Sequence, residues 1–403
     1  MKAGLLSYFA LVALVAACSK EAPTTSPSAP GAGSALVKSA QGPELTAAPK
    51  ATAKNEAASN QLMGDKELGE LVGRLSERTG DFPSDNFVSN ETSYLDVVWA
   101  LAKPSLHGRA YMGVGPEQNL TYIARMKPSM AYIVDIRRQN MLELMIIRAC
   151  METESTRAGF LGCLMSRTVG QGLPEGASVQ QLVDRIESSQ ASKESLAAGT
   201  KATIQLMERL GTKASKADEA SIGTVRKAFY DKGLSLAYSM EGSARVYPTL
   251  GAILTSSSPQ NDGGGFLATT EQYAWLRQFV LENRLVPVVG DFGSPLALGR
   301  VAEDMKGRGV KLGVFYTSNV EQYLFQDRKY ETFLGNIRKM PYDENSLMIR
   351  VWFDQGRAHP KQRAGHRTTS LVHEAKGFLD RAEQKPFRSY WEVMQYPSME
   401  QGK

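Results

Sequence analysis

Apolar residues follow two patterns along the chain, short unbroken runs and longer repeats with helical spacing. Residues 110–114 (AYMGV) and 130–136 (MAYIVDI) are almost wholly apolar, as is typical of strands covered on both faces of a parallel sheet. Between them, residues 116–127 repeat apolar side chains with the spacing of a helix, and Pro128 ends that repeat. The pattern predicts a strand, a tight glycine turn, a helix and a second strand.

A second unit of the same kind follows later in the chain. Residues 285–289 (LVPVV) predict a strand, residues 295–309 a helix with a glycine stop, and residues 310–316 the next strand. Ser318 is expected to cap the helix that begins NVEQYLF, and residues 347–353 predict a late strand. Two such units predict a doubly wound, Rossmann-like α/β domain with a mostly parallel sheet.

A long stretch between the two units shows helical spacing only. Residues 153 to about 240 therefore predict a helical insertion. Cys150 and Cys163 lie thirteen residues apart at its start, and along one continuous helix they would be roughly 20 Å apart. We expect two buried thiols, and a disulfide is the alternative if the two cysteines lie on successive helices.

The N-terminus has the pattern of an export signal. Lys2 precedes an apolar run that is too short to span a bilayer, and small residues follow. Residues 15–18 (VAAC) resemble the lipobox of bacterial lipoproteins, which implies removal of residues 1–17 and acylation of Cys18. Ser19 resembles sorting to the outer membrane in Gram-negative bacteria. An uncleaved signal anchor is the alternative.

Residues 18–62 contain hardly any large apolar side chain and are rich in Ala, Pro, Ser and Thr. Such a segment cannot bury enough surface to fold, so we expect a tether between the lipid and a domain that spans 63–403. The net charge of +5 is only mildly basic for 403 residues. We expect a membrane contact through the lipid on Cys18 and no nucleic-acid partner.

The turn after the first predicted strand raises the question of a cofactor. A dinucleotide fingerprint needs a third glycine three residues after Gly115, and Gln118 occupies that position, which disfavours NAD and FAD. Asp135 lies twenty residues after Gly115, where such folds place the acceptor for ribose hydroxyls. A purely structural turn, with Asp135 capping a neighbouring helix, is the alternative.

This combination resembles class I methyltransferases that use S-adenosylmethionine. In that resemblance Gly113 and Gly115 match the glycine turn and Asp135 matches the ribose-binding acid, which implies a methyltransferase-like fold and S-adenosylmethionine as the cofactor. The chain is also similar to an uncharacterised bacterial family with the phrases VGPEQNxTYI, VDIRRxN and SNVEQYL. That second resemblance implies a fold and no established activity.

Polar residues follow each predicted parallel strand, and in an open α/β sheet these loops converge on one crevice. The candidates for binding a small ligand there are Gly113, Gly115, Glu117, Gln118, Asn119, Asp135, Arg137 and Asn319. The candidate acid or base groups are Glu117, Asp291 and Glu321. We expect no metal, because Pro360 and Gly365 break any helix that would align the three histidines between 359 and 373.

Two functions stay open at this point. In the first, the chain is a lipid-anchored envelope protein with a methyltransferase-like domain that binds an adenosyl cofactor. In the second, it is a non-catalytic, tethered binding protein that kept the fold. Cys18 places the domain outside the cytoplasm, whereas S-adenosylmethionine is a cytoplasmic compound, so compartment and fold favour different readings.

Overall fold

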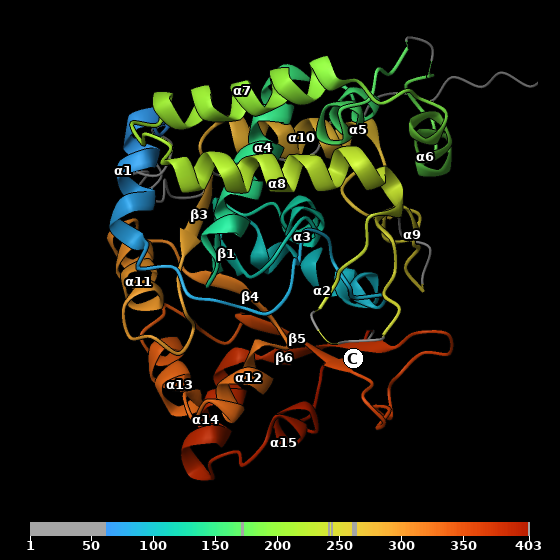
Figure 1. Ribbon diagram of the computed structural model, residues 1–403. Helices are drawn as coiled ribbons and strands as arrows, with labels where there is room; N and C mark the ends of the chain where they lie inside the picture. The colour runs from blue at the N-terminus through green and yellow to red at the C-terminus, as the bar shows by residue number, and fades with distance from the viewer. Residues whose placement is uncertain (1–61, 171–172, 241, 243–244, 260–263, 402–403) are drawn as a thin grey trace, which may run out of the picture. The chain divides into compact units, whose positions relative to one another are not determined.

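A six-stranded sheet forms the centre of the computed structural model, which describes residues 62–170, 173–240, 242, 245–259 and 264–401 (Figure 1). Its order is β3-β2-β1-β4-β5-β6, with β1 to β5 parallel and β6 antiparallel to β5. This is the 3-2-1-4-5-6 order of doubly wound sheets, so the predicted fold class is confirmed. The strands are β1 (Ala110–Gly113), β2 (Met130–Asp135), β3 (Leu285–Val289), β4 (Leu312–Ser318), β5 (Leu347–Phe353) and β6 (Thr368–Glu374).

The strands β1 to β4 are buried along nearly their whole length because helices cover both faces of the sheet. Pro287 lies in β3, which is an edge strand and therefore tolerates a residue without an N–H group. The segment after α1 (Asp65–Leu75) covers this edge, since the N–H of Glu77 donates to Val289 O at 2.9 Å and Ser76 Oγ accepts from Val289 N at 3.0 Å. These two hydrogen bonds occupy the N–H and C=O groups of Val289, the last residue of the edge strand.

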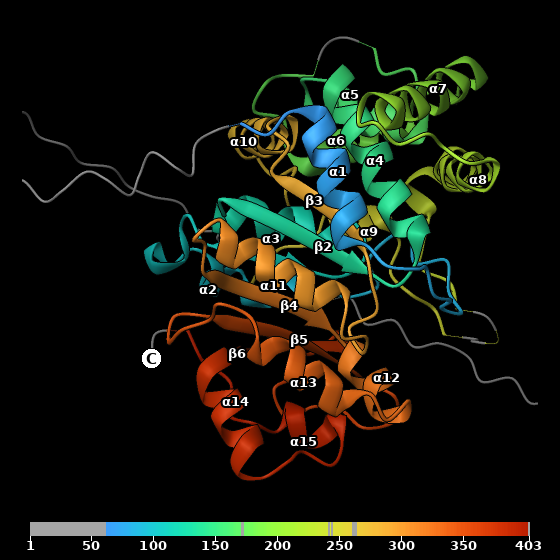
Figure 2. The same ribbon diagram turned by 90° about the vertical axis from the view of Figure 1, so that its left-hand side faces the viewer.

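Two crossover helices lie on opposite sides of the sheet, as Figure 2 shows. α3 (Gln118–Met126) connects β1 to β2, and α11 (Ala297–Gly307) lies between β3 and β4. The first crossover moves toward the β3 edge and the second moves toward the β6 edge, so right-handed connections place the two helices on opposite faces.

The ends of these helices follow from backbone conformation. α3 ends where Lys127 adopts a left-handed conformation (φ +52°) just before Pro128, as predicted. α11 is followed by Gly309 (φ +67°), and β4 begins two residues later than the predicted strand 310–316. The prediction that Ser318 caps the next helix is wrong, because Ser318 is the last residue of β4 (φ +51°) and its hydroxyl donates to Glu91.

The connection between β2 and β3 consists of helices joined by loops, as expected, but it runs from Arg138 to Leu281 and so extends beyond the predicted bounds of 153 to about 240 at both ends. α4 leaves β2 almost directly and packs against α5, α7, α8 and α10, so most of its residues are buried. The insertion contains α4 (Arg138–Thr153), α5 (Arg157–Met165), α6 (Val179–Glu187), α7 (Lys193–Arg209), α8 (Lys216–Lys232), the 3₁₀ helix η3 (Gly233–Ser235), α9 (Leu250–Leu254) and α10 (Thr270–Leu281).

Cys150 and Cys163 form a disulfide, which corrects the expectation of two free thiols. Cys150 lies on α4 and Cys163 on α5, and the helical path is broken between Thr153 and Arg157. The break folds α5 back against α4, so the two Cα atoms are 5.6 Å apart, well within bridging distance.

The antiparallel edge strand β6 was not expected from the sequence. Its residues Thr368, Thr369, Ser370 and His373 are polar and buried, so the run lacks the apolar pattern of the other strands. Ser93 Oγ lies 2.8 Å from Thr368 Oγ1, so the buried Thr368 hydroxyl has a hydrogen-bond partner. The other elements are η1 (Tyr94–Val97), α2 (Val98–Leu101), η2 (Pro104–Leu106), α12 (Val320–Gln326), α13 (Tyr330–Arg338), α14 (Ala375–Gln384) and α15 (Tyr390–Met394).

Candidate functional site

A cavity of about 480 Å³ lies at the carboxyl ends of the parallel strands, and we refer to it as the crevice. It lies where the crossover direction reverses between β1 and β4, the position at which doubly wound folds bind ligands. Its volume is within the range of about 300–1,000 Å³ that is usual for small-molecule pockets. The walls come from residues between 81 and 91, from the loops after β1 to β4, and from Tyr238, Met240, Arg245 and Tyr247.

Five residues predicted from separate loops meet in the crevice. The lining includes Gly115 after β1, Asp135 and Arg137 after β2, Asp291 after β3, and Asn319 after β4. Their meeting was predicted from the rule that parallel strands end at one edge of a sheet. The observed topology follows that rule.

Gly115 exposes its backbone to the crevice. Its φ of +83° is a conformation that favours glycine, and a side chain at this position would meet only Asn86 Nδ2, at 3.8 Å. A ligand can therefore approach the main chain here more closely than at any residue with a side chain.

Asp135 is buried at the end of β2 and retains one oxygen for a ligand. Oδ1 accepts the N–H of Arg137 at 2.9 Å and lies 3.5 Å from Arg137 Nε. No residue in the described part of the chain donates a hydrogen bond to Oδ2. The carboxylate is thus oriented by its own turn, and its second oxygen is an acceptor at the crevice wall.

Several buried polar atoms of Arg137 and of the first turns of α4 have no hydrogen-bond partner among the described residues. Among the described residues, Arg137 Nη2, both amide atoms of Asn140 and both carboxyl oxygens of Glu143 make no hydrogen bond. Burial raises the pKa of Glu143 well above its usual range, and the negative charge of Glu117 adds to the effect. Such groups are rare in folded proteins and mark this end of α4 as a polar site rather than ordinary core.

Asp291 is positioned by the loop after β3. Its Oδ1 accepts the N–H of Gly293 at 2.8 Å, and its Oδ2 forms an ion pair with Lys329 Nζ at 2.8 Å. Both side chains remain partly exposed, so the pair can separate at modest energetic cost. Of the three predicted acid or base candidates, Asp291 lines the crevice, whereas Glu117 and Glu321 do not.

Asn119 does not face the crevice but builds its glycine turn. The side chain is fully buried, and its Nδ2 donates to the carbonyl oxygens of Val114 (2.9 Å), Gly115 (3.2 Å) and Pro116 (2.9 Å). Tyr111 OH donates to its Oδ1 at 2.8 Å. Asn119 therefore satisfies the polar backbone of the turn, which is a structural role.

Gly113 is needed for the same packing. A Cβ atom at this position would lie 2.0 Å from Asn119 Oδ1 and 2.8 Å from Tyr111 OH, distances that real Cβ atoms do not show. Gly113 makes room for the asparagine side chain, and it does not line the crevice.

Glu117 and Gln118 anchor the loop that forms one wall. Both oxygens of Glu117 accept the N–H of Ser89 at 3.1 Å, and burial raises the pKa of Glu117 to about 7. Gln118 Nε2 donates to Glu91 Oε2 at 2.7 Å and to Tyr122 OH at 3.1 Å. These two residues act on the crevice through the loop rather than by lining it.

Glu321, on α12, forms a buried ion pair with Arg350 of β5. Its Oε1 accepts from Arg350 Nε at 2.6 Å and from Thr317 Oγ1 at 3.1 Å, and the side chains of Glu321 and Arg350 are 0 % exposed. The proposed acid or base role of Glu321 has no geometric support, because the carboxylate does not reach the crevice.

Glu91 lines the crevice and was not among the predicted site residues. It is 1 % exposed, and it accepts from Tyr316 OH at 2.7 Å, from Gln118 Nε2 at 2.7 Å and from the Ser318 hydroxyl. Burial raises the pKa of Glu91, while these three donors favour its ionised form. The sequence shows Glu91 only as part of a polar loop before β1, and nothing in its spacing indicates that the loop folds over the strand ends.

Aromatic side chains form the outer part of the crevice. Phe82 packs edge-on against Tyr323 with ring centroids 5.1 Å apart, and Tyr238 packs against Tyr247 at 4.7 Å. Rings of this kind provide flat apolar surface for a planar ligand group.

The charges in the crevice favour a ligand that is not strongly anionic. Its lining has five carboxylates (Asp81, Glu91, Asp135, Asp291 and Asp327) and three cations (Arg137, Arg245 and Lys329). An excess of carboxylates disfavours a polyphosphate and suits a neutral, polyhydroxylated or cationic ligand.

Residues 86–402 match the sequence model of a domain of unknown function, DUF7790. The chain belongs to the DUF7790 family. A search of curated proteins found no match. The matched region of this DUF7790 protein contains the whole sheet, the helical insertion and every crevice residue from Asn86 onward, so the crevice is part of the family domain.

Two further findings concern the part of this DUF7790 protein that the structure describes. Within residues 62–401, apart from the short gaps, no helix is long and apolar enough to cross a membrane. Over the same part of the chain, no three His, Cys, Asp or Glu side chains are grouped so that they could hold a metal ion. The predicted leader, Cys18 and all of the predicted tether before residue 62 lie outside the described residues.

Proposed function

We propose that this chain is a lipid-anchored envelope protein whose crevice binds S-adenosylmethionine or a related adenosyl ligand. The observation that supports this most is the meeting of Gly115, Asp135, Asp291 and Asn319 in one cavity at the switch point of a doubly wound sheet. Binding is the proposal, and methyl transfer is a further activity that the same site would allow.

The side chains present fit an adenosyl ligand in three respects. The open backbone at Gly115 admits a group that must approach the main chain closely. Asp135 Oδ2 is an acceptor suited to the paired hydroxyls of a ribose. The rings of Phe82 and Tyr323 offer apolar surface for a base.

The charge of the ligand also agrees with the crevice. S-adenosylmethionine carries a sulfonium cation and an ammonium group against one carboxylate, so its net charge is positive. The excess of carboxylates in the crevice favours such a ligand over ATP or a dinucleotide.

When bound, S-adenosylmethionine would supply an electrophilic methyl group, and the protein would have to orient an acceptor and, where needed, remove its proton. Asp291 is the predicted base that lines the crevice, and Glu91 is a second carboxyl group there. Asp291 is held by Lys329, and Glu91 by three donors, so both are already engaged.

That engagement favours a second candidate function, a non-catalytic binding lipoprotein that uses the same crevice for another small polar ligand. The two functions differ in ligand class and in turnover. An adenosyl-binding protein will discriminate adenosyl compounds from other polar solutes, and a methyltransferase will also convert S-adenosylmethionine to S-adenosylhomocysteine in the presence of an acceptor.

Isothermal titration calorimetry with S-adenosylmethionine, S-adenosylhomocysteine, adenosine and ATP tests the proposal. We expect binding of the first two, weaker binding of adenosine, and the weakest binding for ATP because of its phosphates. A folded protein that binds none of these at millimolar concentration would contradict the adenosyl proposal and favour the second candidate.

The lipid anchor is tested separately. The VAAC sequence at 15–18 is the basis of this part of the proposal. We expect Cys18→Ala to abolish acylation and to leave a soluble or unprocessed product in a bacterial host, with metabolic labelling by a palmitate analogue as the readout. Unchanged processing and unchanged membrane fractionation of the variant would contradict the lipoprotein assignment.

A further inference from the structure

The disulfide of the helical insertion has two unlike sulfurs. Cys150 is fully buried on α4, whereas Cys163 on α5 is partly exposed and lines a separate cavity of about 420 Å³. Small residues such as Gly159, Gly162 and Ala198 leave this second cavity open. One sulfur is therefore accessible to a small molecule or a peptide side chain, and the other is not.

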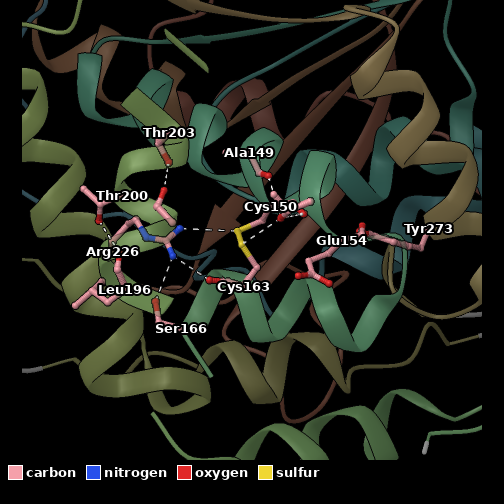
Figure 3. Close-up of a disulfide and its surroundings, with 12 residues drawn as sticks. Ala149, Cys150, Glu154, Cys163, Ser166, Leu196, Thr200, Thr203, Arg226 and Tyr273 are labelled. Carbon is pink, nitrogen blue, oxygen red and sulfur yellow. Dashed lines mark hydrogen bonds between the residues drawn. A yellow bond between two sulfur atoms is a disulfide. The ribbon is translucent and has the colours of Figure 1, made fainter. Parts of the chain in front are cut away.

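A buried cation contacts the inaccessible sulfur. Arg226 on α8 is 1 % exposed, and Figure 3 shows its guanidinium group pointing at the disulfide, with Nη1 3.8 Å from Cys150 Sγ. No carboxylate in the described part of the chain forms an ion pair with Arg226, and burial lowers its pKa to about 10. The equally buried Arg350, by contrast, pairs with Glu321 at 2.6 Å.

Helix capping explains only part of this arrangement. Arg226 Nη2 donates to Cys163 O at 3.0 Å and to Ser166 Oγ at 3.2 Å, so it satisfies the C-terminal end of α5. Its Nη1 has only the sulfur as a partner, and its Nε has none among the described residues. A neutral disulfide gives such a cation little stabilisation, whereas a thiolate at Cys150 would be its counter-ion.

The surrounding helices keep the guanidinium in this position. Gly199 lies in the middle of α7, and a Cβ atom there would be 2.0 Å from Arg226 Nη2. A glycine inside an exposed helix is unfavourable by about 1 kcal/mol relative to alanine. Here it provides the space that lets the guanidinium reach the sulfur.

We propose that the Cys150–Cys163 disulfide is a site of thiol–disulfide exchange, at which an external thiolate attacks Cys163 Sγ from the cavity and Cys150 leaves as a thiolate beside Arg226. The Cys150–Cys163 bond breaks, its electron pair stays on Cys150, and a mixed disulfide forms between the external sulfur and Cys163. The second thiol of a dithiol reductant then attacks its own bound sulfur and releases the Cys163 thiolate. The reductant becomes a disulfide, and the protein gains two electrons and two protons as a pair of thiols.

The rate of reduction by dithiothreitol tests the role of Arg226. The experiment uses the full-length chain with Cys18→Ser, so that Cys150 and Cys163 are the two cysteines left to react. We expect Arg226→Met to be reduced roughly three- to tenfold more slowly than the parent, because its leaving thiol has a higher pKa. Arg226→Lys should react at nearly the parent rate.

Arg157→Met is the matched control, because Arg157 is also a buried arginine of this region but donates to backbone carbonyl groups and does not contact sulfur. We expect its disulfide to be reduced at the parent rate or faster. Unfolding of Arg226→Met would expose the disulfide and speed its reduction, so a slower rate cannot arise from misfolding. A folded Arg226→Met with an unchanged or faster rate would overturn the proposal.

Single-cysteine variants decide the outcome if Arg226→Met does not fold. In the same background, Cys150→Ser leaves the Cys163 thiol and Cys163→Ser leaves the Cys150 thiol. We expect Cys150→Ser to form a mixed disulfide with oxidised glutathione roughly tenfold faster than Cys163→Ser does, because the remaining Cys163 thiol faces the cavity. Equal rates, or faster reaction of Cys163→Ser, would overturn the proposal.

Discussion

Two groups of polar residues surround the glycine turn after β1, and they face opposite ways. Gly115, Asp135 and Asn319 line the crevice, whereas Asn119 and Gln118 point away from it and bond to the turn and to the loop that carries Glu91. Gly115 and Asn119 are only four residues apart in the sequence. Polar residues clustered at one strand end therefore include both groups that face the crevice and the framework that holds them in place.

The two groups should respond differently to substitution. Removing a framework residue leaves buried partners unsatisfied and lowers the free energy of unfolding. We expect removal of a crevice residue to delete a contact to the proposed ligand and to leave the fold largely unchanged. Stability and affinity measured on the same variants therefore separate the two groups.

The largest effect is expected for Glu321→Ala. Its removal leaves the Arg350 guanidinium buried without a counter-ion, so the free energy of unfolding should fall by about 3–5 kcal/mol. Denaturant titration measures this change. Asp291→Ala is the control, because its ion pair with Lys329 is partly exposed and should contribute about 1 kcal/mol or less. A Glu321→Ala protein as stable as the wild type would show that the pair is not structural.

A smaller loss is expected for Asn119→Ala. Three backbone carbonyl groups and the Tyr111 hydroxyl lose their partner, which should lower the free energy of unfolding by about 2–4 kcal/mol. Asn319→Ala is the matched control in the crevice and should change stability by less than about 1 kcal/mol. Equal destabilisation of the two variants would remove the distinction between framework and crevice.

The pH dependence of stability tests the framework role of Glu117. Burial raises the folded-state pKa of Glu117 to about 7, above its usual value of 4.5, so the folded protein holds this proton more tightly than the unfolded chain. The contribution is complete below about pH 4.5 and is lost as the pH rises through 7. We expect Glu117→Gln to remove a decrease of about 3 kcal/mol over that range. Parallel stability curves for wild type and variant would contradict a raised pKa.

The sequence predicted most of the sheet but not its whole site. The buried strands β1, β2 and β3 consist almost wholly of apolar residues, and the ends of β1 and β2 indicated where Gly115 and Asp135 would meet. β6 was missed because most of its buried residues are polar, and the disulfide because a break after Thr153 turns the chain back. Glu321 was misjudged because the direction of its side chain at the start of a helix depends on tertiary contacts.

Asp135 tests the proposal that the crevice binds an adenosyl ligand through the end of β2. Calorimetry with S-adenosylhomocysteine should show that Asp135→Ala weakens binding by about 1.5 kcal/mol, roughly tenfold in Kd, because the ribose loses a charged hydrogen-bond acceptor. Asp327→Ala is the control, since it removes an exposed carboxylate from the same rim and should change the free energy of binding by less than about 0.5 kcal/mol. Equal affinities of Asp135→Ala and the wild type, with both proteins folded, would contradict the account.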